Sequence, residues 1–253
     1  MQAVQYSYTV QVARADQSRA LPPPWSRAPQ RRQRRRRREP LDPETIVDAA
    51  LALLDADGLD QLSMRHVARS LDTTAAALYW HVGSKDGLLD LMFDRVIGEQ
   101  AVPDADPERW RAQVKEVART MRATILRHRD IVRLSIGRLP LGPNALRWSD
   151  RVLAILRAGG LPDAVAVTAH QLLISIVLGF AIDETGEGGH PPADQPPPET
   201  AAATARDYLA ALPGERFPNL VALAGHFADA DADQQFELLL DIFVAGLAQR
   251  AHP

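Results

Sequence analysis

The chain has 253 residues, a net charge of −3 and no cysteine. This length is enough for one large domain or two modest domains, each with a buried core. The lack of cysteine excludes disulfide frameworks, thiolate nucleophiles and cysteine-bound metals, and it is typical of a protein of the reducing cytoplasm. Alanine and leucine dominate the 46% of hydrophobic residues, whereas aromatic residues make up only 6%, which favours helices over sheets.

Positive charge is concentrated near the N-terminus. Residues 1–40 hold ten arginines against Asp16 and Glu39, and most of these arginines lie in the run RRQRRRRR at 31–38. No helical or strand period is visible there, so residues 1–40 are predicted to form a disordered arm. The arm could offset the repulsion between DNA phosphates and the acidic segment 41–102, or it could be a solvated tail or a mispredicted start.

One long apolar segment raises the question of a membrane. Residues 164–182, AVAVTAHQLLISIVLGFAI, are uncharged and nearly long enough to span a bilayer. However, His170 and Gln171 interrupt the segment, and its flanks are acidic, at Asp163 and Asp183, rather than basic. The first thirty residues also lack the apolar core of a secretory signal. We therefore predict an interface helix of a protein without a membrane span.

Helices are predicted from residue 41 onward. Asp42 is a good N-cap, Pro43 suits the first helical position, and Gly58 supplies a left-handed stop, so a helix is expected between them. A short second helix follows Ser63 and ends near residue 71, a third covers about 74–82, and a fourth is capped by Ser84.

Two short helices joined by a tight turn, with a helix before and a helix after, are typical of a DNA-reading helix-turn-helix. The turn is Leu71-Asp72-Thr73, where Asp72 takes the place of the more usual glycine because aspartate tolerates left-handed angles.

Beyond Pro103 the pattern is helical over roughly 107–128, 130–138, 143–158, 162–183, 203–212, 218–228 and 233–250. The segment TGEGGHPPADQPPPET, residues 185–200, is predicted to be a loop because it is rich in proline and glycine. The whole chain is thus expected to be all-α, with an N-terminal three-helix domain and a C-terminal helical bundle.

The stretch LSMRHVARSLDTTAAALYWHVGSKDGLLD, residues 62–90, resembles the DNA-binding domain of the TetR family of bacterial repressors. The run LYWHV is most similar to the tetracycline-repressor branch, and the resemblance continues more weakly through Trp110, Gly137, Pro140 and Gly160. It implies a homodimeric repressor that binds a palindromic double-stranded DNA operator. It also implies that the protein releases the operator when a small-molecule effector enters the C-terminal domain.

The resemblance also implies a division of the chain. Residues 1–40 are the arm, 41–88 the helix-turn-helix DNA-binding domain, 89–102 a connecting helix and linker, and 103–253 the effector-binding and dimerisation domain. In the dimer, helices 162–183 and 233–250 of each chain are expected to form a four-helix bundle. The fourth helix, which joins the domains, is expected to act as the lever.

Five side chains of the DNA-binding domain are expected at the phosphates or bases. Arg65 can bind a guanine through two hydrogen bonds, although a solvated arginine is the alternative. Tyr79 and His81 project in different directions and either reach phosphates or pack inward. Trp80 is expected mainly to fill the seam between the first and fourth helices, with an edge near the DNA backbone. Lys85 adds a cation to the anion site at a helix N-terminus.

The start of the third helix is expected to read bases only weakly. Ala75, Ala76 and Ala77 can touch a thymine methyl group but cannot hydrogen-bond a base. Thr73 and Thr74 are equally suited to capping the helix and to contacting a base.

The effector site departs from the tetracycline-repressor pattern. The resemblance places metal- or drug-binding histidines where this chain has Ala101 and Ser135, and it places a polar amide and an aromatic where this chain has Val117 and Met121. Because magnesium needs hard oxygen or imidazole ligands, a tetracycline–magnesium complex is not expected. We predict a largely apolar effector bound without metal or cofactor, in a pocket lined by Val117, Met121, Ser135, Trp148, Ile176 and Phe180, with Asp183 at an acidic rim. The same residues could instead fill a core.

Catalytic chemistry finds little support in the sequence. His128-Arg129-Asp130 is similar to a kinase catalytic triplet, but no glycine-rich phosphate loop accompanies it, and the seven histidines contain no i,i+4 zinc-binding pair. We therefore predict a protein without enzymatic activity. Two alternatives remain: an effector-independent DNA-binding protein, which would have a solid core, and a helical-bundle enzyme, which would need polar residues converging in the C-terminal domain.

Overall fold

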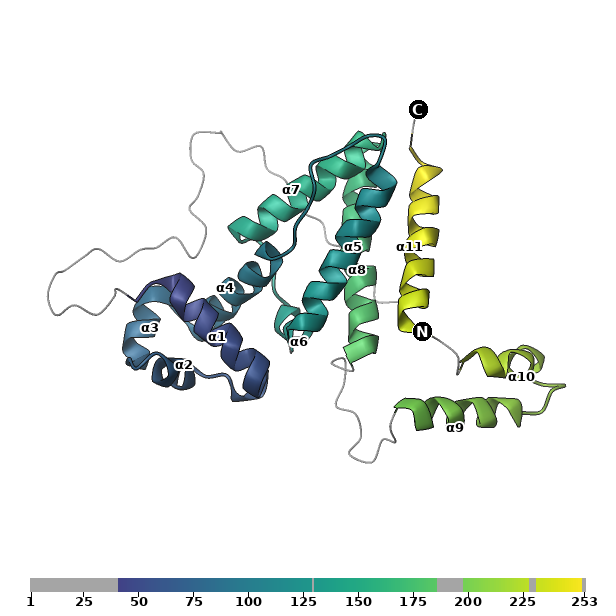
Figure 1. Cartoon of the computed structure of the whole chain (residues 1–253), viewed down its shortest axis with the longest axis horizontal. Coiled ribbons are helices and arrows are strands. Elements are labelled where there is room, and N and C mark those ends of the chain that lie inside the picture. Colours follow the sequence, from purple (N-terminus) through teal and green to yellow (C-terminus); the bar gives the residue numbers. More distant parts are fainter. Residues whose placement is uncertain (1–40, 129, 186–197, 228–230, 252–253) are drawn as a thin grey trace, which may run out of the picture. The chain divides into compact units, whose positions relative to one another are not determined.

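The computed structural model describes residues 41–128, 130–185, 198–227 and 231–251. Every regular element in these ranges is a helix, which confirms the all-α fold class (Figure 1). The predicted arginine-rich arm, residue 129 and most of the predicted 185–200 loop lie outside the described residues.

The N-terminal headpiece, residues 41–98, follows the sequence prediction closely. Its elements are α1 Pro43–Asp57, the 3-10 turn η1 Leu59–Gln61, α2 Met64–Ser70, α3 Ala75–Val82 and α4 Lys85–Gly98. The predicted N-caps are confirmed, since Asp42 Oδ1 accepts a hydrogen bond from the Thr45 amide at 2.7 Å. This bond lowers the pKa of Asp42. Ser63 and Ser84 cap α2 and α4 in the same way.

The turn between α2 and α3 places Asp72 at a φ of 47°, which confirms the left-handed turn expected there. Gly58 ends α1 at a φ of 83°, as predicted. Buried leucine, isoleucine and methionine side chains on all four helices form the headpiece core, among them Ile46, Leu54 and Leu78, each 0% exposed. This core fixes the orientation of α3 against α2.

The C-terminal region contains α5 Trp110–Arg127, α6 Ile131–Ser135, α7 Pro143–Ala158, α8 Asp163–Thr185, α9 Pro198–Ala210, α10 Pro218–Leu223 with the 3-10 turn η2 Ala224–Phe227, and α11 Ala232–Ala248. Several predicted boundaries differ from the observed ones, and two of these differences have a clear physical reason. Helix α6 ends at Ser135 rather than 138, because Gly137 adopts a φ of 76°. Helix α9 begins at Pro198, inside the predicted loop, since proline is well tolerated in the first turn.

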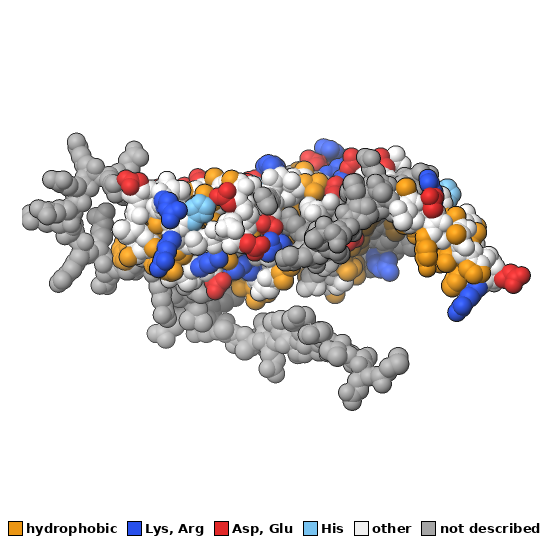
Figure 2. All heavy atoms as spheres, turned by 90° about the horizontal axis from the view of Figure 1, so that it is seen from below, with side chains coloured by type: hydrophobic (Ala, Val, Ile, Leu, Met, Phe, Trp, Pro, Cys, Tyr) orange, Lys and Arg blue, Asp and Glu red, His pale blue; other side chains and the backbone are white. Residues whose placement is uncertain are grey.

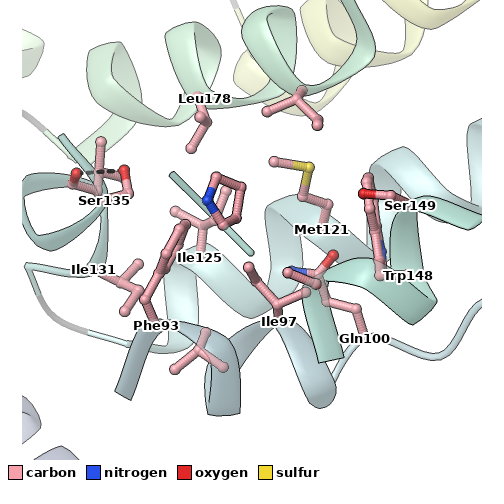
Figure 3. A pocket seen from close by; sticks show the side chains of 15 residues that line it. Phe93, Ile97, Gln100, Met121, Ile125, Ile131, Ser135, Trp148, Ser149 and Leu178 are labelled. Carbon is pink, nitrogen blue, oxygen red and sulfur yellow. Dashed lines mark hydrogen bonds between the residues drawn. The ribbon is translucent and has the colours of Figure 1, made fainter. Parts of the chain in front are cut away.

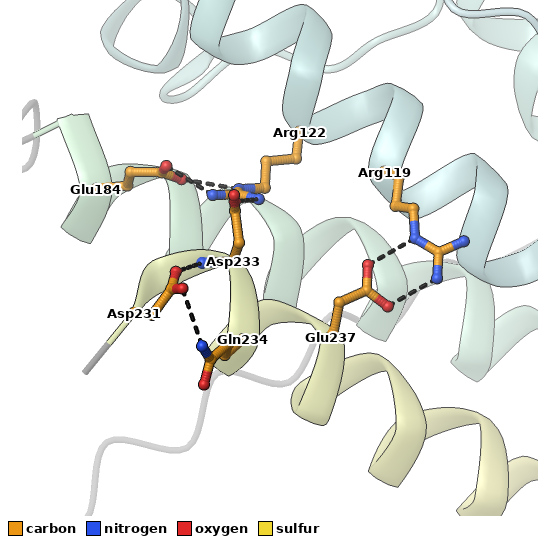
Figure 4. A network of polar contacts seen from close by, with 7 residues as sticks. All are labelled: Arg119, Arg122, Glu184, Asp231, Asp233, Gln234 and Glu237. Carbon is orange, nitrogen blue, oxygen red and sulfur yellow. Dashed lines mark hydrogen bonds and ion pairs between the residues drawn. The ribbon is translucent and has the colours of Figure 1, made fainter. Parts of the chain in front are cut away.

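Helices α5, α7 and α8 pack against one another, α4 packs on α7, and α11 packs on α5 and α8 (Figure 1). Exposed ion pairs reinforce the α5–α11 contact. Arg119 binds Glu237 through two hydrogen bonds of 2.6 and 2.7 Å (Figure 4), and Lys115 pairs with Asp241. The Arg119 contact lowers the pKa of Glu237.

Arg122 joins three helices. From α5, its guanidinium binds Glu184 of α8 at 2.7 Å and Asp233 of α11 at 2.7 Å (Figure 4). The same guanidinium lies over the rings of Phe180 and Phe236, at 5.4 and 4.9 Å from their centroids. Hydrogen bonds to Glu184 and Asp233 raise the pKa of Arg122, so this side chain holds α11 in place as a permanent cation.

Helix α8 is long and apolar enough to cross a membrane by length and composition, with a mean hydropathy of 2.1 in its most apolar window. Only 28% of that window is buried within the protein. Side chains such as Val167 and Leu172 remain about half exposed. On α11, Leu238 and Ile242 are likewise exposed, so both helices present an uncovered apolar face.

Candidate DNA-binding face and effector cavity

The headpiece presents a basic surface at its helix-turn-helix. Arg65 and Arg69 are exposed on α2, and His66 beside them is half-buried. Figure 2 shows Lys and Arg side chains gathered with a histidine over this end of the headpiece. Lys85 is also exposed, at the first position of α4. The cations predicted from the sequence therefore lie on the surface of the helix-turn-helix and of the helix that follows it.

The aromatic residues of α3 are also exposed. Tyr79 and Trp80 are 47% and 51% exposed, while His81 is half-buried and meets the edge of the Trp80 ring at 4.8 Å between centroids. The expectation that Trp80 fills the seam between α1 and α4 was wrong. Leu78 and Val82, which flank it on α3, take the buried positions instead, so Trp80 must point outward.

The start of α3 offers few polar groups. Thr74 is the N-cap, and its hydroxyl accepts a hydrogen bond from the Ala77 amide at 3.2 Å. Thr73 is half-buried, and Ala76 is more exposed than Ala75 and Ala77. This arrangement leaves methyl groups, rather than hydrogen-bonding groups, as the surface that α3 offers at its N-terminus.

Two contacts fasten α4 to the C-terminal region. Near its start, the Arg138 guanidinium donates to the backbone oxygen of Asp86 at 3.2 Å, to Asp86 Oδ1 at 3.1 Å and to Asp90 Oδ1 at 2.5 Å. Arg138 also donates to the Leu134 carbonyl of α6 at 3.0 Å. The segment that follows α6 is therefore bound to the helix turn next to Lys85.

The second contact lies at Asp94, which is only 8% exposed. Its carboxylate accepts hydrogen bonds from the amides of Asn144 and Ala145 at the start of α7, at 3.1 and 2.9 Å from Oδ1. Gly142, the residue before α7, has no side chain to cap it. The buried aspartate of α4 thus provides the cap that α7 lacks.

The corner around His128 joins the headpiece to the C-terminal region. Buried His128 lies between two carboxylates, with Nδ1 at 3.1 Å from Asp55 of α1 and Nε2 at 3.0 Å from Glu99 after α4. Asp130 accepts a hydrogen bond from the Leu59 amide at 2.8 Å. His128 and Asp130 therefore bind the headpiece at the corner between α5 and α6.

A cavity of about 60 Å³ lies between α4, α5, α6, α7 and α8 (Figure 3). Its lining is mostly apolar and comprises Phe93, Val96, Ile97, Gln100, Met121, Ile125, Ile131, Val132, Ser135, Pro140, Ala145, Trp148, Ser149, Ile174 and Leu178. Small-molecule sites usually measure ~300–1,000 Å³, so this cavity must expand to admit such a ligand. A larger, more open hollow of about 390 Å³ adjoins it and includes Ala101.

The structure brings Met121, Ser135 and Trp148 together in the cavity lining, as the sequence analysis placed them. It places the other predicted residues elsewhere. Val117 is buried on α5 outside the lining, and Ile176 and Phe180 lie on another face of α8, where Phe180 packs against the Phe236 ring at 5.1 Å between centroids. Asp183 is exposed and forms no rim to this cavity.

The cavity has four polar side chains, two of which have buried atoms without a partner. Ser135 donates its hydroxyl to the Val132 carbonyl at 2.7 Å. Among the described residues, Gln100 Oε1 and Trp148 Nε1 are buried and have no hydrogen-bond partner. Gln100 was missed from the sequence, since a glutamine at a helix end gives no periodic signal. Unpaired buried polar atoms are costly, and they indicate a missing partner.

His170 of α8 contacts the cavity residue Trp148, with 5.7 Å between the two ring centroids. Burial lowers the pKa of His170, so the ring is neutral at neutral pH. The described residues contain no group of three histidine, cysteine, aspartate or glutamate side chains arranged to hold a metal ion.

Comparisons with known proteins agree with this arrangement. The model for bacterial regulatory proteins of the tetR family matches residues 46–92, and the model for the tetracyclin repressor-like C-terminal domain matches residues 102–251. An HTH-type transcriptional regulator of Saccharopolyspora erythraea is 35% identical over 213 residues, which cover 83% of this chain and 86% of that protein. Tetracycline repressor protein class A of Escherichia coli is 31% identical over 83% of this chain and 92% of its own length. Among solved structures, ActR of Streptomyces coelicolor in complex with actinorhodin is 44% identical, with a TM-score of 0.77, over 85% of this chain and 98% of that one.

Proposed function

Because the chain belongs to the TetR family of bacterial transcriptional regulators, we propose that it is a cytoplasmic repressor that a largely apolar molecule, bound without metal, releases from a palindromic operator. Residues 41–88 bind DNA, and residues 103–253 bind the effector and form the dimer surface. Residues 89–102 connect these two domains. The role of residues 1–40 is separate from this proposal.

The single observation that carries the proposal concerns α4. Its first residue, Lys85, is exposed beside the helix-turn-helix, and its later residues Phe93, Val96 and Ile97 line the cavity. One rigid helix therefore forms part of the DNA-binding surface and part of the cavity wall. A ligand that changes the position of this wall must also change the position of Lys85.

At the DNA surface, Lys85 and the first-turn amides of α4 bind a phosphate, because Ser84 takes only the Gly87 amide at 2.9 Å. Arg65 reaches a base edge, and exposed Tyr79 and half-buried His81 contact the backbone. The small residues at the start of α3, Thr73, Thr74, Ala75, Ala76 and Ala77, lie against the groove, where methyl contacts with thymine are the available readout.

Release follows from the small size of the cavity. A ligand larger than about 60 Å³ can enter only if the walls separate, so it binds an expanded conformation more tightly than the one described here. Such a difference in affinity is what shifts a two-state equilibrium. Expansion moves α6 and the Arg138 segment, which pulls on Asp86 and Asp90 at the DNA-binding end of α4.

Dimerisation uses the uncovered apolar faces of α8 and α11. Val167, Leu172, Leu238 and Ile242 are each between 48% and 65% exposed, and large exposed apolar faces mark protein contacts. Pairing these helices with those of a second copy buries them in a four-helix bundle. A dimer with two-fold symmetry also explains why the operator should be palindromic.

The two alternatives have weaker support. An effector-independent DNA-binding protein would have a solid core, whereas this chain has a cavity beside α4. An enzyme would need an acid, a base or a nucleophile there, and the described lining includes no titratable side chain and only two hydroxyl groups, of Ser135 and Ser149. Met121 and its apolar neighbours instead suit a binding site.

The test begins with the DNA that the purified full-length protein retains from fragmented genomic DNA of its source. Sequencing this DNA identifies the operator, and the complex is then titrated with apolar compounds in the presence of magnesium and of a chelator. We expect release to be independent of magnesium. Retention of no preferred sequence contradicts repressor function, and release that requires magnesium contradicts metal-free binding.

A further inference from the structure

The inner cavity and the outer hollow share three wall residues, Ile97, Gln100 and Trp148. The inner cavity is walled mainly by aliphatic and aromatic side chains (Figure 3). The outer hollow is lined by Ile97, Gly98, Gln100, Ala101, Val102, Asn144, Arg147, Trp148 and Arg151. The two spaces therefore differ in chemistry and meet at a polar boundary.

The boundary holds two unpaired groups. Gln100 Oε1 is a hydrogen-bond acceptor and Trp148 Nε1 is a donor, and neither has a partner among the described residues. Trp148 is only 7% exposed, so bulk water does not readily supply one. In Figure 3 the amide of Gln100, which lies just after α4, extends towards the space between Met121 and Trp148. A single hydroxyl can both donate to a carbonyl oxygen and accept from an indole N–H.

The outer hollow is cationic. Arg147 and Arg151 lie four residues apart on α7, and the described lining of the hollow contains no carboxylate. Arg147 donates to the side-chain oxygen of Asn144, which is uncharged. Arg151 donates to the Val102 carbonyl at 2.7 Å, and its ion pair with Asp104 spans 3.3 Å and involves a carboxylate that is 95% exposed. Neither guanidinium is neutralised by a buried anion, and exposed pairs contribute little.

We infer that the effector is an amphipathic organic carboxylate, with its apolar body in the inner cavity, a hydroxyl at Gln100 and Trp148, and its carboxylate in the outer hollow at Arg147 and Arg151. Guanidinium groups bind carboxylates through paired, charge-assisted hydrogen bonds, which gives this end of the ligand its orientation. The inference rests on the proposed function, because it assigns a ligand class to the same cavity. It predicts that neutral apolar compounds bind more weakly than acids of the same shape.

The test uses matched probes and direct binding, so that it needs no operator. Full-length protein is titrated calorimetrically with 2-naphthylacetate and with its neutral amide, 2-naphthylacetamide. We expect the acid to bind about tenfold more tightly than the amide, as charge-assisted bonds require. The double variant Arg147→Gln/Arg151→Gln should lose this preference and keep its affinity for the amide. Arg157→Gln, which removes an exposed arginine of α7 outside the hollow, should change neither affinity.

A third probe, 6-hydroxy-2-naphthylacetate, tests the polar boundary. The hydroxyl should strengthen binding to the parent protein, and Gln100→Leu should remove that gain while the affinity for 2-naphthylacetate stays within about twofold, since only the hydroxyl partner is lost. Trp148→Phe keeps a ring in the wall and should also reduce the gain. An unchanged gain in both variants overturns the boundary assignment.

Three results would each overturn the inference. The parent protein could bind acid and amide with equal affinity, or the double arginine variant could keep the preference for the acid. The third result is that neither probe binds at about 1 mM. These outcomes leave the proposed function separately testable. If the neutral amide binds and releases the operator as well as the acid does, the effector cavity stands and only the anionic ligand class falls. If the parent protein retains no operator, the proposed function itself fails.

Discussion

Asp94 of α4 and Ala145 of α7 are joined by a hydrogen bond of 2.9 Å between a buried carboxylate and a backbone amide. A second hydrogen bond reinforces it, because the Asn144 side-chain amide donates to the backbone carbonyl of Asp94 at 3.1 Å. Helix α4 is therefore fixed to α7 near its middle, while Arg138 holds it nearer its DNA-binding end. These two attachments define how motion in the cavity wall can reach the headpiece.

Asp94→Ala should destabilise the protein by ~1–3 kcal/mol, because it leaves the first amides of α7 without their acceptor. Urea unfolding followed by circular dichroism measures this loss. Gly142→Ala should also destabilise, since a Cβ there would overlap the Asp94 carboxylate. In the double variant the carboxylate is absent and only the Cβ of residue 94 remains close to the new Cβ, at 2.7 Å, so the overlap is smaller and the combined loss should be less than the sum of the two. Strict additivity would show that the carboxylate and Gly142 are not coupled.

Arg138→Gln should uncouple the cavity from the DNA-binding end of α4. The variant loses its charged contacts with Asp86 and Asp90 but retains the cavity lining. We expect the affinity for the effector in the absence of DNA to change little. The effector should, however, weaken operator binding less in the variant than in the parent. The ratio of the operator affinity without effector to that with effector should fall by about 5-fold or more, which corresponds to the usual size of an allosteric coupling energy. Fluorescence anisotropy with labelled operator measures this ratio. Arg133→Gln is the control for the loss of a nearby arginine, because Arg133 pairs with Asp60 of η1 and not with the acidic residues of α4.

Lys85→Ala should weaken binding to all DNA sequences alike and reduce the dependence of affinity on salt, because it removes a phosphate contact. Arg65→Ala should instead relax the preference at one base pair by ~1–3 kcal/mol. Binding measured against a set of single-base operator variants separates the two effects. Parental affinity in both variants would contradict the assignment of this face to DNA.

Ile242→Glu should convert the dimer to a monomer, since it places a charge on the uncovered face of α11, where Ile242 is 65% exposed. Sedimentation velocity gives the oligomeric state directly. Leu146→Glu is a matched control, because Leu146 is 54% exposed on α7, outside the proposed interface. A dimeric Ile242→Glu protein, or a monomeric Leu146→Glu protein, would place the interface elsewhere.

His170 should make stability depend on pH. Burial lowers its pKa below the ordinary value of 6.5, so the unfolded chain binds a proton more readily than the folded protein. The parent protein should therefore lose stability relative to His170→Phe as the pH falls from 6.5 to the folded pKa, and the stabilities of the two proteins should run parallel at pH values well above 6.5. Thermal unfolding at a series of pH values tests this. If the difference in stability between the two proteins stayed constant at all of these pH values, burial would not lower the pKa of His170.

The sequence was sufficient to predict the elements whose signals are local. Asp42 and Ser84 cap the helices that directly follow them, so short-range hydrogen-bond rules located α1 and α4 correctly. The cap of α7 could not be found in this way, because its acceptor, Asp94, lies about fifty residues earlier in the chain. Only the bare Gly142 before α7 indicated that a cap had to come from elsewhere.

The cavity was harder to predict for a similar reason. Helix α8 is apolar on all sides, so its periodicity does not show which face meets the cavity. Ile176 and Phe180 were predicted to line the cavity, whereas the structure places Ile174 and Leu178 in the lining. Trp80 was expected mainly to fill the seam between the first and fourth helices because of its bulk, yet Leu78 and Val82 are the residues of α3 that are buried.

The walls of the cavity have unequal freedom to diverge during evolution. Met121, Ile125, Ile174 and Leu178 come from α5 and α8, whose main contacts are with each other and with α6, α7 and α11 rather than with the headpiece. Phe93 and Ile97, in contrast, belong to the helix that begins at Lys85. A duplicated gene could therefore acquire a new chemical signal through substitutions on α5 and α8 while it inherits the ancestral operator unchanged.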